Sequence, residues 1–170
     1  MCENLNQSRF YKMKIGENMR ISIVSGKDEG PTKLNAFDNA LSNAGIGDVN
    51  LIKVSSMLSG NAEICELPKL KPGAMVNCVL SSITSDNPGD EIAVVVAVAI
   101  GDELGCVVET SGINKNLNDL LEEAENMVKY MMEKRKVEIK DLIVEYSTTH
   151  VKNIASCIAS VVYLNDEIEL

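Results

Sequence analysis

Nine consecutive apolar residues, Ile92-Ala93-Val94-Val95-Val96-Ala97-Val98-Ala99-Ile100, form the longest apolar run of the chain. The run falls well short of the ~18 residues that a membrane span requires, and it indicates a strand. Because both alternate faces of this strand are apolar, we expect other elements to cover both sides of it. Asp86-Asn87-Pro88-Gly89-Asp90 comes shortly before the run and predicts a turn.

Outward from this run, further apolar segments predict strands, and two segments with helical periodicity predict helices. The other expected strands cover residues 20–24, 48–56, 75–82, 105–109, 142–146 and 154–164, and the expected helices cover residues 33–44 and 117–136. Thr32 fits the N-cap of the first helix and Gly45 its left-handed stop. Residues 25–31, with glycines at 26 and 30, are expected to form a loop. The pattern predicts one α/β or α+β domain over residues 20–170, preceded by a polar arm at residues 1–19.

The composition limits the possible partners. The chain has 170 residues, with 16 basic and 25 acidic side chains and a net charge of −9. Nucleic-acid binding needs clustered Lys and Arg, so this composition argues against a nucleic-acid partner, whereas a negative field favours cationic small molecules. The first residues lack the basic and apolar regions of a secretory signal, and no segment could span a membrane. We therefore expect a cytoplasmic protein with no membrane partner.

Cysteine and histidine are too scattered to predict a metal site. The five cysteines form no CxxC pair and His150 is the only histidine, whereas zinc needs clustered ligands. We expect the cysteines to be reduced and to pack as small apolar residues. His150 follows Ser147-Thr148-Thr149, a polar segment that indicates a turn or a strand end more than a catalytic relay.

Two carboxylates have apolar neighbours in the sequence. On the first expected helix, Leu34, Phe37 and Leu41 follow the spacing of a buried stripe. Asp38 shares a side with Leu34 and Leu41 and therefore needs a partner, which is either a cationic ligand or, more ordinarily, a backbone amide or a lysine. Glu109 ends an expected apolar strand. There it is either a proton donor with a raised pKa or simply a solvated acid at a strand end.

The pair Ser55-Ser56, at the end of an expected strand, gains meaning from the residues around it. The relevant segments are Leu34-Asn35-Ala36-Phe37-Asp38-Asn39-Ala40-Leu41, Asn43-Ala44-Gly45-Ile46-Gly47-Asp48-Val49-Asn50-Leu51-Ile52-Lys53-Val54-Ser55-Ser56, Ala62-Glu63-Ile64, Leu67-Pro68-Lys69-Leu70, Gly73-Ala74 and residues 105–109. Together they closely resemble the pyruvoyl-dependent arginine decarboxylases. The resemblance covers roughly residues 20–165, and a block of this length that ends in the serine pair is a specific motif.

The resemblance implies that the chain makes its own cofactor. The Ser56 hydroxyl would attack the Ser55 carbonyl, the peptide would become an ester that breaks by β-elimination, and residue 56 would become a covalent pyruvoyl group. A small chain would end at Ser55 and a large chain would begin at residue 56. Asn50 matches the family asparagine that polarises this carbonyl or orients the site.

The resemblance also implies the reaction and the assembly. L-Arginine would be converted to agmatine and carbon dioxide through a Schiff base to the pyruvoyl group, feeding polyamine synthesis. Glu109 matches the acid that returns a proton to the α-carbon, and Asp38 matches the acid that binds the substrate guanidinium. The implied fold is a four-layer αββα sandwich similar to that of pyruvoyl-dependent histidine decarboxylase. The implied assembly is a trimer, or a dimer of trimers, with active sites between neighbouring subunits.

Two alternatives stay open: the same machinery acting on another amino acid, and an uncleaved homologue with a structural, non-catalytic role. The joint retention of the five matching residues argues against the second alternative; they are Asp38, Asn50, Ser55, Ser56 and Glu109. Ser59-Gly60 stands where the family usually carries a proline, which predicts a looser loop, and residues 1–19 have no clear family counterpart.

Overall fold

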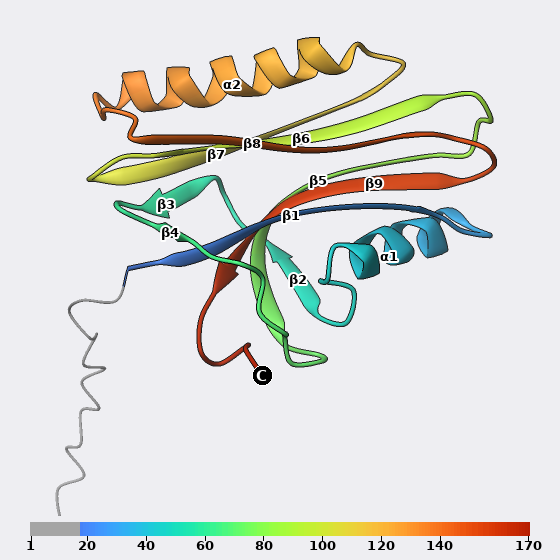
Figure 1. Cartoon of the computed structure of the whole chain (residues 1–170), viewed down its shortest axis with the longest axis horizontal. Helices are drawn as coiled ribbons and strands as arrows, with labels where there is room; N and C mark the ends of the chain where they lie inside the picture. The colour runs from blue at the N-terminus through green and yellow to red at the C-terminus, as the bar shows by residue number, and fades with distance from the viewer. Residues whose placement is uncertain (1–17) are drawn as a thin grey trace, which may run out of the picture.

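The computed structural model describes residues 18–170, so the expected arm at residues 1–19 lies outside the described residues except for Asn18 and Met19. The elements are β1 (Arg20–Glu29), α1 (Lys33–Asn43), β2 (Asn50–Lys53), β3 (Met57–Ser59), β4 (Glu63–Ile64), β5 (Met75–Ser85), β6 (Glu91–Ile100), β7 (Leu104–Ile113), α2 (Leu117–Lys134), β8 (Asp141–His150) and β9 (Ala155–Leu164). They form four layers, with one helix outside each of two stacked sheets (Figure 1). This arrangement confirms the α+β class and the αββα sandwich.

The two sheets have different strand orders. Sheet A has five strands in the order β2-β5-β9-β1-β4, and sheet B has four in the order β3-β7-β6-β8. Strands β9 and β6 lie inside their sheets and pair with neighbours on both sides over most of their lengths. Strands β2 and β3 are edge strands, one in each sheet, and the short connection between them carries the chain from sheet A to sheet B.

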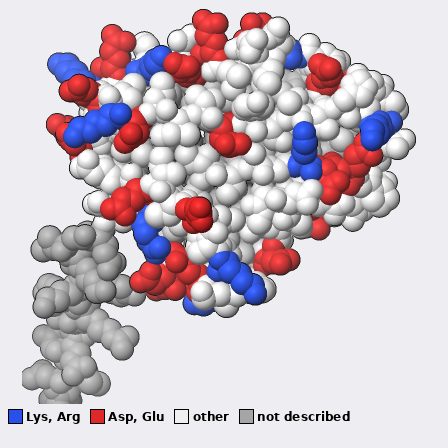
Figure 2. Space-filling view, viewed as in Figure 1, with Lys and Arg blue, Asp and Glu red and all other residues white. Residues whose placement is uncertain are grey.

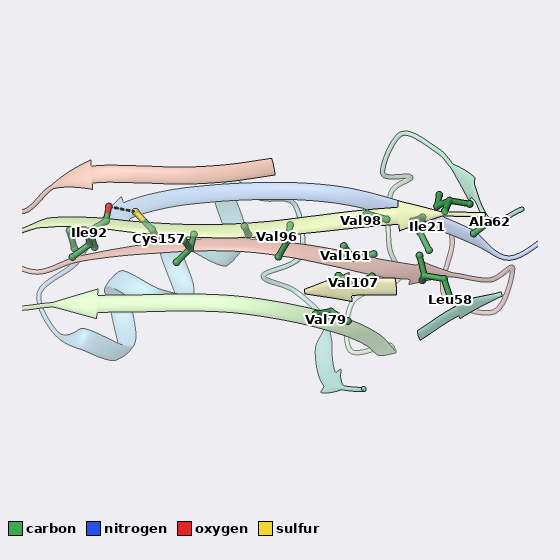
Figure 3. Packing of buried hydrophobic residues seen from close by; sticks show 14 of the residues in the cluster. Ile21, Leu58, Ala62, Val79, Ile92, Val96, Val98, Val107, Cys157 and Val161 are labelled. Carbon is green, nitrogen blue, oxygen red and sulfur yellow. Dashed lines mark hydrogen bonds between the residues drawn. The ribbon is translucent and has the colours of Figure 1, made fainter. Parts of the chain in front are cut away.

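Strand β6 contains the long apolar run and is buried along almost its entire length. Its even-numbered residues, such as Val96, face sheet A, whereas its odd-numbered residues, such as Val95, face α2. Figure 3 shows the inner cluster, in which Val96 and Val98 of β6 lie with Val107 of β7 and with Ile21 and Val161 from the opposite sheet. The prediction of a strand covered on both faces is therefore confirmed.

Helix α1 covers the outer face of sheet A, but its buried side differs from the predicted one. Ala36, Ala40 and Leu41 are buried, whereas Leu34 is 74% exposed, so the predicted stripe through Leu34 was wrong. The small alanines face the sheet because α1 lies directly against the backbone of β1 at Gly26. A side chain at position 26 would prevent this close approach. The Thr32 hydroxyl accepts from the Asn35 N–H at 3.2 Å, which confirms the expected N-cap.

Helix α2 covers the outer face of sheet B close to its predicted bounds. It ends at Lys134, two residues earlier than expected, and it buries Leu120, Ala124, Val128 and Met132. These positions keep the i, i+4 spacing of one helical face. Asn116 is its N-cap.

Several expected strand boundaries were wrong. Strand β7 continues past Glu109 to Ile113 because it pairs with β6 over that whole length, so Glu109 lies within a strand and not at its end. Strand β1 continues through the segment expected to be a loop, because all ten of its residues, through Glu29, pair with β9. The expected strand at residues 48–56 keeps strand pairing only from Asn50 to Lys53, because the chain then leaves sheet A and begins β3 at Met57.

The surface mixes charges of both signs. On the face seen in Figure 2, basic side chains are interspersed with acidic ones. Arg20 pairs with Asp166 at 2.9 Å and with Glu169 at 2.8 Å, and Lys33 pairs with Asp86 at 3.0 Å. The Lys33–Asp86 pair is exposed and adds little to the free energy of unfolding, whereas the Arg20–Glu169 pair is partly buried. None of the helices within residues 18–170 has the length and apolar character needed to cross a membrane.

Candidate active site

The predicted cleavage pair lies where the chain crosses from one sheet to the other. Ser55 and Ser56 belong to the connection between β2, at the edge of sheet A, and β3, at the edge of sheet B. Figure 1 shows β2 in the lower sheet and β3 in the upper one. Ser55 is exposed and Ser56 is partly exposed, so a group formed here could be reached by a substrate.

Backbone hydrogen bonds fix the crossing on both sides of the serine pair. On the sheet A side, the Val54 N–H donates to the Cys78 carbonyl at 3.0 Å. On the sheet B side, the Val107 N–H donates to the Ser56 carbonyl at 2.9 Å. The Ser55–Ser56 peptide bond therefore lies between two anchored points.

The Ser55 carbonyl itself also accepts a hydrogen bond. The Met57 N–H donates to this oxygen at 2.8 Å, which closes a three-residue turn around Ser56. A donor at this distance is suited to stabilising negative charge on a carbonyl oxygen. The next carbonyl, that of Met57, accepts from the Tyr163 hydroxyl at 2.8 Å.

Glu109 lies on β7 close to this crossing. It follows Val107, the residue whose N–H contacts the Ser56 carbonyl, by two positions, so both side chains point to the same face of β7. That face is the one that meets sheet A, because Val107 belongs to the cluster between the sheets. The Glu109 side chain is exposed and lies beyond the last β3 pairing with β7, at Met57 and Cys106.

A small cavity lies beside Glu109. Its volume is about 250 Å³, and its lining residues come from β2, β5 and β7: Lys53, Leu80, Ser81, Ser82, Glu109, Thr110 and Ser111. The Ser81 hydroxyl donates to the Thr110 carbonyl at 2.7 Å, which links β5 to β7 at the residue next to Glu109. The cavity is therefore lined by one carboxylate, one ammonium group and several hydroxyls.

Two titratable groups near the crossing have shifted pKa values. Burial raises the pKa of the Cys78 thiol. The charge of Lys53 lowers this pKa and the charge of Glu109 raises it, both by less than burial does. Burial likewise raises the pKa of Tyr163, so its phenol remains protonated and able to donate at neutral pH. Cys78 thus behaves as a buried thiol and Tyr163 as a neutral hydrogen-bond donor.

Asp38 does not lie near the serine pair of the same chain. It is exposed on α1 and not on a buried apolar face, and its neighbour Asn39 donates to the Glu29 carbonyl at 2.8 Å, at the end of β1. Tyr163, which contacts the crossing, pairs with Ile21 near the start of β1. Glu29 and Ile21 are eight residues apart along the extended strand β1, which corresponds to roughly 26 Å. Asp38 and Tyr163 therefore lie near opposite ends of β1.

Asn50 also lies away from the Ser55 carbonyl of its own chain. It begins β2, and its side-chain amide donates to the Gly73 carbonyl at 2.9 Å. Five residues of extended chain separate Asn50 from Ser55, or roughly 16 Å. Within one chain, the structure therefore brings Ser55, Ser56 and Glu109 together but not Asp38 or Asn50.

Three side chains around the crossing were not predicted from the sequence: Lys53, Ser81 and Tyr163. Tyr163 carried a weak signal, because a tyrosine inside an apolar strand usually needs a partner for its hydroxyl. Ser81 and Lys53 carried none, since only the packing of β5 against β7 and β2 gives them a role.

Comparisons with known proteins point to one family. The family model described as pyruvoyl-dependent arginine decarboxylase matches residues 20–168. A pyruvoyl-dependent arginine decarboxylase of Methanothermobacter thermautotrophicus is 55% identical over 147 residues, which cover 86% of this chain and 97% of that protein. One of the same description from Pyrococcus furiosus is 44% identical over 115 residues, covering 65% of this chain and 70% of that protein.

A solved structure of pyruvoyl-dependent histidine decarboxylase covers 59% of this chain and 55% of its own, with 17% identity and a TM-score of 0.45. The family match spans both the crossing that contains Ser55 and Ser56 and the strand that contains Glu109. This chain therefore belongs to the pyruvoyl-dependent arginine decarboxylase family.

Proposed function

We propose that this chain cleaves itself between Ser55 and Ser56 and that the processed protein decarboxylates L-arginine to agmatine and carbon dioxide. Family membership supports the activity. The observation that supports the cleavage point is the position of the Ser55 carbonyl, which accepts from the Met57 N–H at 2.8 Å in an exposed, anchored crossing. These residues fit the formation of a pyruvoyl group at residue 56.

The cleavage needs no reagent other than water. A lone pair of the Ser56 hydroxyl oxygen attacks the Ser55 carbonyl carbon, the C–N bond breaks, and the hydroxyl proton ends on the Ser56 nitrogen. This rearrangement converts the amide into an ester of the same composition. Loss of the Ser56 α-proton then breaks the bond between Cβ and the ester oxygen, so that Ser55 leaves as a carboxylate. Water converts the remaining dehydroalanine into a pyruvoyl group and ammonia.

The chain's own residues bind the substrate and move its protons. The pyruvoyl group, once formed, supplies an electron sink for the decarboxylation. Glu109, beside the crossing, is suited to return a proton to the substrate α-carbon. Asp38 is suited to bind the guanidinium, because a carboxylate can accept two parallel hydrogen bonds from that planar cation.

The separation of Asp38 and Asn50 from the serine pair supports an assembly. We assign these two side chains to the active site of a neighbouring copy, in a homotrimer or a dimer of trimers. Exposed apolar side chains lie near the relevant surfaces: Leu34 on α1, Ile52 on β2, Met57 on β3 and Met75 on β5. Burial of such side chains between copies stabilises an oligomer.

A cytoplasmic location fits the chemical state of the cysteines. The four described cysteines are free thiols, and Cys78, Cys106 and Cys157 are buried. Reducing compartments maintain thiols in this state.

The cleavage proposal is tested by intact mass spectrometry of the purified protein. We expect two chains, the larger beginning with a pyruvoyl group at residue 56, and one intact chain for Ser56→Ala, which lacks the attacking hydroxyl. Ser59→Ala is the matched control, because this exposed serine lies on β3 just beyond the pair, and it should process normally. One intact wild-type chain, or cleavage of Ser56→Ala at the same bond, would overturn the proposal and favour a structural, uncleaved homologue.

A further inference from the structure

Tyr163 connects the two layers of the sandwich at the proposed cleavage site. It lies on β9 of sheet A, pairs with Ile21 of β1, and packs against the cluster between the sheets. Its hydroxyl donates to the carbonyl of Met57, the first residue of β3 in sheet B, at 2.8 Å. One side chain therefore holds the edge strand that follows the serine pair.

The contact with Met57 has a consequence for the preceding peptide. Met57 has two backbone hydrogen bonds with different partners: its carbonyl accepts from Tyr163, and its N–H donates to the Ser55 carbonyl at 2.8 Å. The Ser56 carbonyl between them accepts from the Val107 N–H at 2.9 Å. Fixing the Met57 carbonyl therefore limits the directions in which the Met57 N–H can point.

The Ser55 oxygen is the atom that becomes negatively charged when the Ser56 hydroxyl attacks. A hydrogen-bond donor that is already in place stabilises such a charge without further reorganisation. The only donor to this oxygen among the described residues is the Met57 N–H.

We infer that Tyr163 is a positioning residue for self-cleavage: by binding the Met57 carbonyl, its hydroxyl holds the Met57 N–H against the Ser55 oxygen during the acyl shift to Ser56. This inference rests on the proposed cleavage between Ser55 and Ser56. It adds a role for the C-terminal strand, which contributes a hydrogen bond to a reaction more than 100 residues away in the sequence.

The surroundings of Tyr163 suit a permanent donor. Its side chain is half-buried and burial raises its pKa, so the proton stays on the oxygen at neutral pH. The other tyrosines of the described chain provide a contrast. Tyr130 and Tyr146 are 63% and 45% exposed, and neither hydroxyl takes part in a hydrogen bond among residues 18–170.

The test measures the cleavage rate of newly synthesised, radiolabelled precursor for wild type and Tyr163→Phe. Loss of the hydroxyl should slow cleavage at least about tenfold, a fraction of the 10²–10³ that a lost oxyanion donor costs. Tyr146→Phe is the matched control and should cleave at the wild-type rate. Replacement of Tyr163 by p-aminophenylalanine keeps an N–H donor on the ring and should restore most of the rate.

Hydroxylamine separates the two steps of the reaction, because it cleaves the ester as soon as the acyl shift has formed it. We expect the Tyr163→Phe precursor to remain at least about tenfold slower than wild type in hydroxylamine, since the shift itself is impaired. A general loss of structure in Tyr163→Phe would instead lower the midpoint of thermal unfolding.

Two results would overturn the inference: equal cleavage rates for wild type and Tyr163→Phe in hydroxylamine, or no rescue by p-aminophenylalanine in a variant with wild-type thermal stability. If Tyr163→Phe does not fold, the rate of the p-aminophenylalanine variant decides, and a wild-type rate supports the inference. A wild-type precursor that never cleaves would instead refute the proposed function.

Discussion

Glu109 lies at the point where three structural features meet. It follows Val107, which contacts the Ser56 carbonyl, it lines a cavity of about 250 Å³, and its strand is linked to β5 through Ser81 and Thr110. Its carboxyl group lies on the same face of β7 as Val107, two residues along the strand from the contact with the Ser56 carbonyl. Its position therefore supports the proposed role as a proton donor, as distinct from a role in holding the fold.

We predict that Glu109→Gln processes at least in part but decarboxylates very poorly. The amide keeps the shape of the side chain and loses the acidic proton, and loss of a positioned acid typically costs about 10²–10⁴ in rate. Steady-state kinetics on the fully processed variant measures the effect. Glu103→Gln, at an exposed position just before β7, is the control. Near-normal turnover of processed Glu109→Gln would remove Glu109 from this role.

The buried thiols predict a loss of stability in alkaline solution. Burial raises the pKa of Cys78, Cys106 and Cys157 above the ordinary value of 9.0. The unfolded chain therefore loses these protons first as the pH rises, and the free energy of unfolding falls from the ordinary pKa upward. Their contribution is fully present below that value.

Denaturant titrations from about pH 8 to pH 10 measure this dependence, because the unfolded thiols ionise within that range. Cys157→Ala removes one of the three groups and should make the decline less steep. An identical decline for wild type and Cys157→Ala would show that other groups cause it.

At the scale of elements, helix α1 depends on a close approach to β1. A Cβ at Gly26 would lie 2.2 Å from the Ala40 carbonyl oxygen and 2.9 Å from the Ala44 nitrogen, both backbone atoms that cannot move without the helix. The same helix carries Asp38 on its exposed side. The position of α1 on the sheet therefore sets the position of the proposed guanidinium ligand.

We predict that Gly26→Ala destabilises the protein by about 1–3 kcal/mol, because overpacking forces the backbone to shift. It should also reduce arginine decarboxylation by the processed enzyme, since α1 carries Asp38. Thermal and denaturant unfolding measure the first effect and kinetics the second. Gly112→Ala is the control, because the nearest atoms to its Cβ belong to the flexible side chain of Lys115. A Gly26→Ala protein as stable as wild type would contradict this account of the packing.

Apolar patterning predicted most elements but not where the chain changes sheets. The run at residues 92–100 predicted a strand buried on both faces, and β6 is one. The second half of β1 is polar and contains Gly26, so its pairing with β9 depends on a partner more than 120 residues away in the sequence. No Gly or Pro marks the break between β2 and β3 in the sequence. The Ser55-Ser56 crossing forms there because β2 and β3 pair with strands of two different sheets.

At the scale of the whole molecule, the proposed site divides into two groups. Ser55, Ser56 and Glu109 meet at one edge of the sandwich, whereas Asp38 lies near the far end of β1. Helical spacing predicted one apolar side for Leu34, Asp38 and Leu41, but Leu41 is buried whereas Leu34 and Asp38 are exposed in the isolated chain, so the prediction of one buried side was wrong. Periodicity shows which residues share a face, but it cannot show whether another copy of the chain covers that face.

A separate prediction concerns the preference for arginine. Asp38→Asn keeps the size of the side chain and loses its charge, so catalytic efficiency with arginine should fall by about 30- to 1,000-fold, as for a lost charge-assisted contact in a partly desolvated site. Citrulline carries no charge to pair and should be affected little. Kinetics on the processed variant with both compounds decides this. Equal losses would mean that Asp38 supports the fold or the cleavage.

The division of the site between copies predicts that two inactive variants complement each other. In a mixed oligomer of Asp38→Asn and Glu109→Gln chains, some sites combine the intact Asp38 of one chain with the intact Glu109 of another. If the two residues come from different copies of a symmetric assembly, random mixing of equal amounts makes about a quarter of all sites intact, and in isolated mixed trimers the fraction is about a third. If both residues came from the same chain, every site would contain one defect and activity would stay at the level of the single variants.

Co-expression with two affinity tags, followed by isolation of the mixed oligomer and an agmatine assay, measures the fraction of intact sites. Activity no higher than that of either variant alone would place the whole site within one chain, against the separation of Asp38 from the Ser55–Ser56 crossing in the fold.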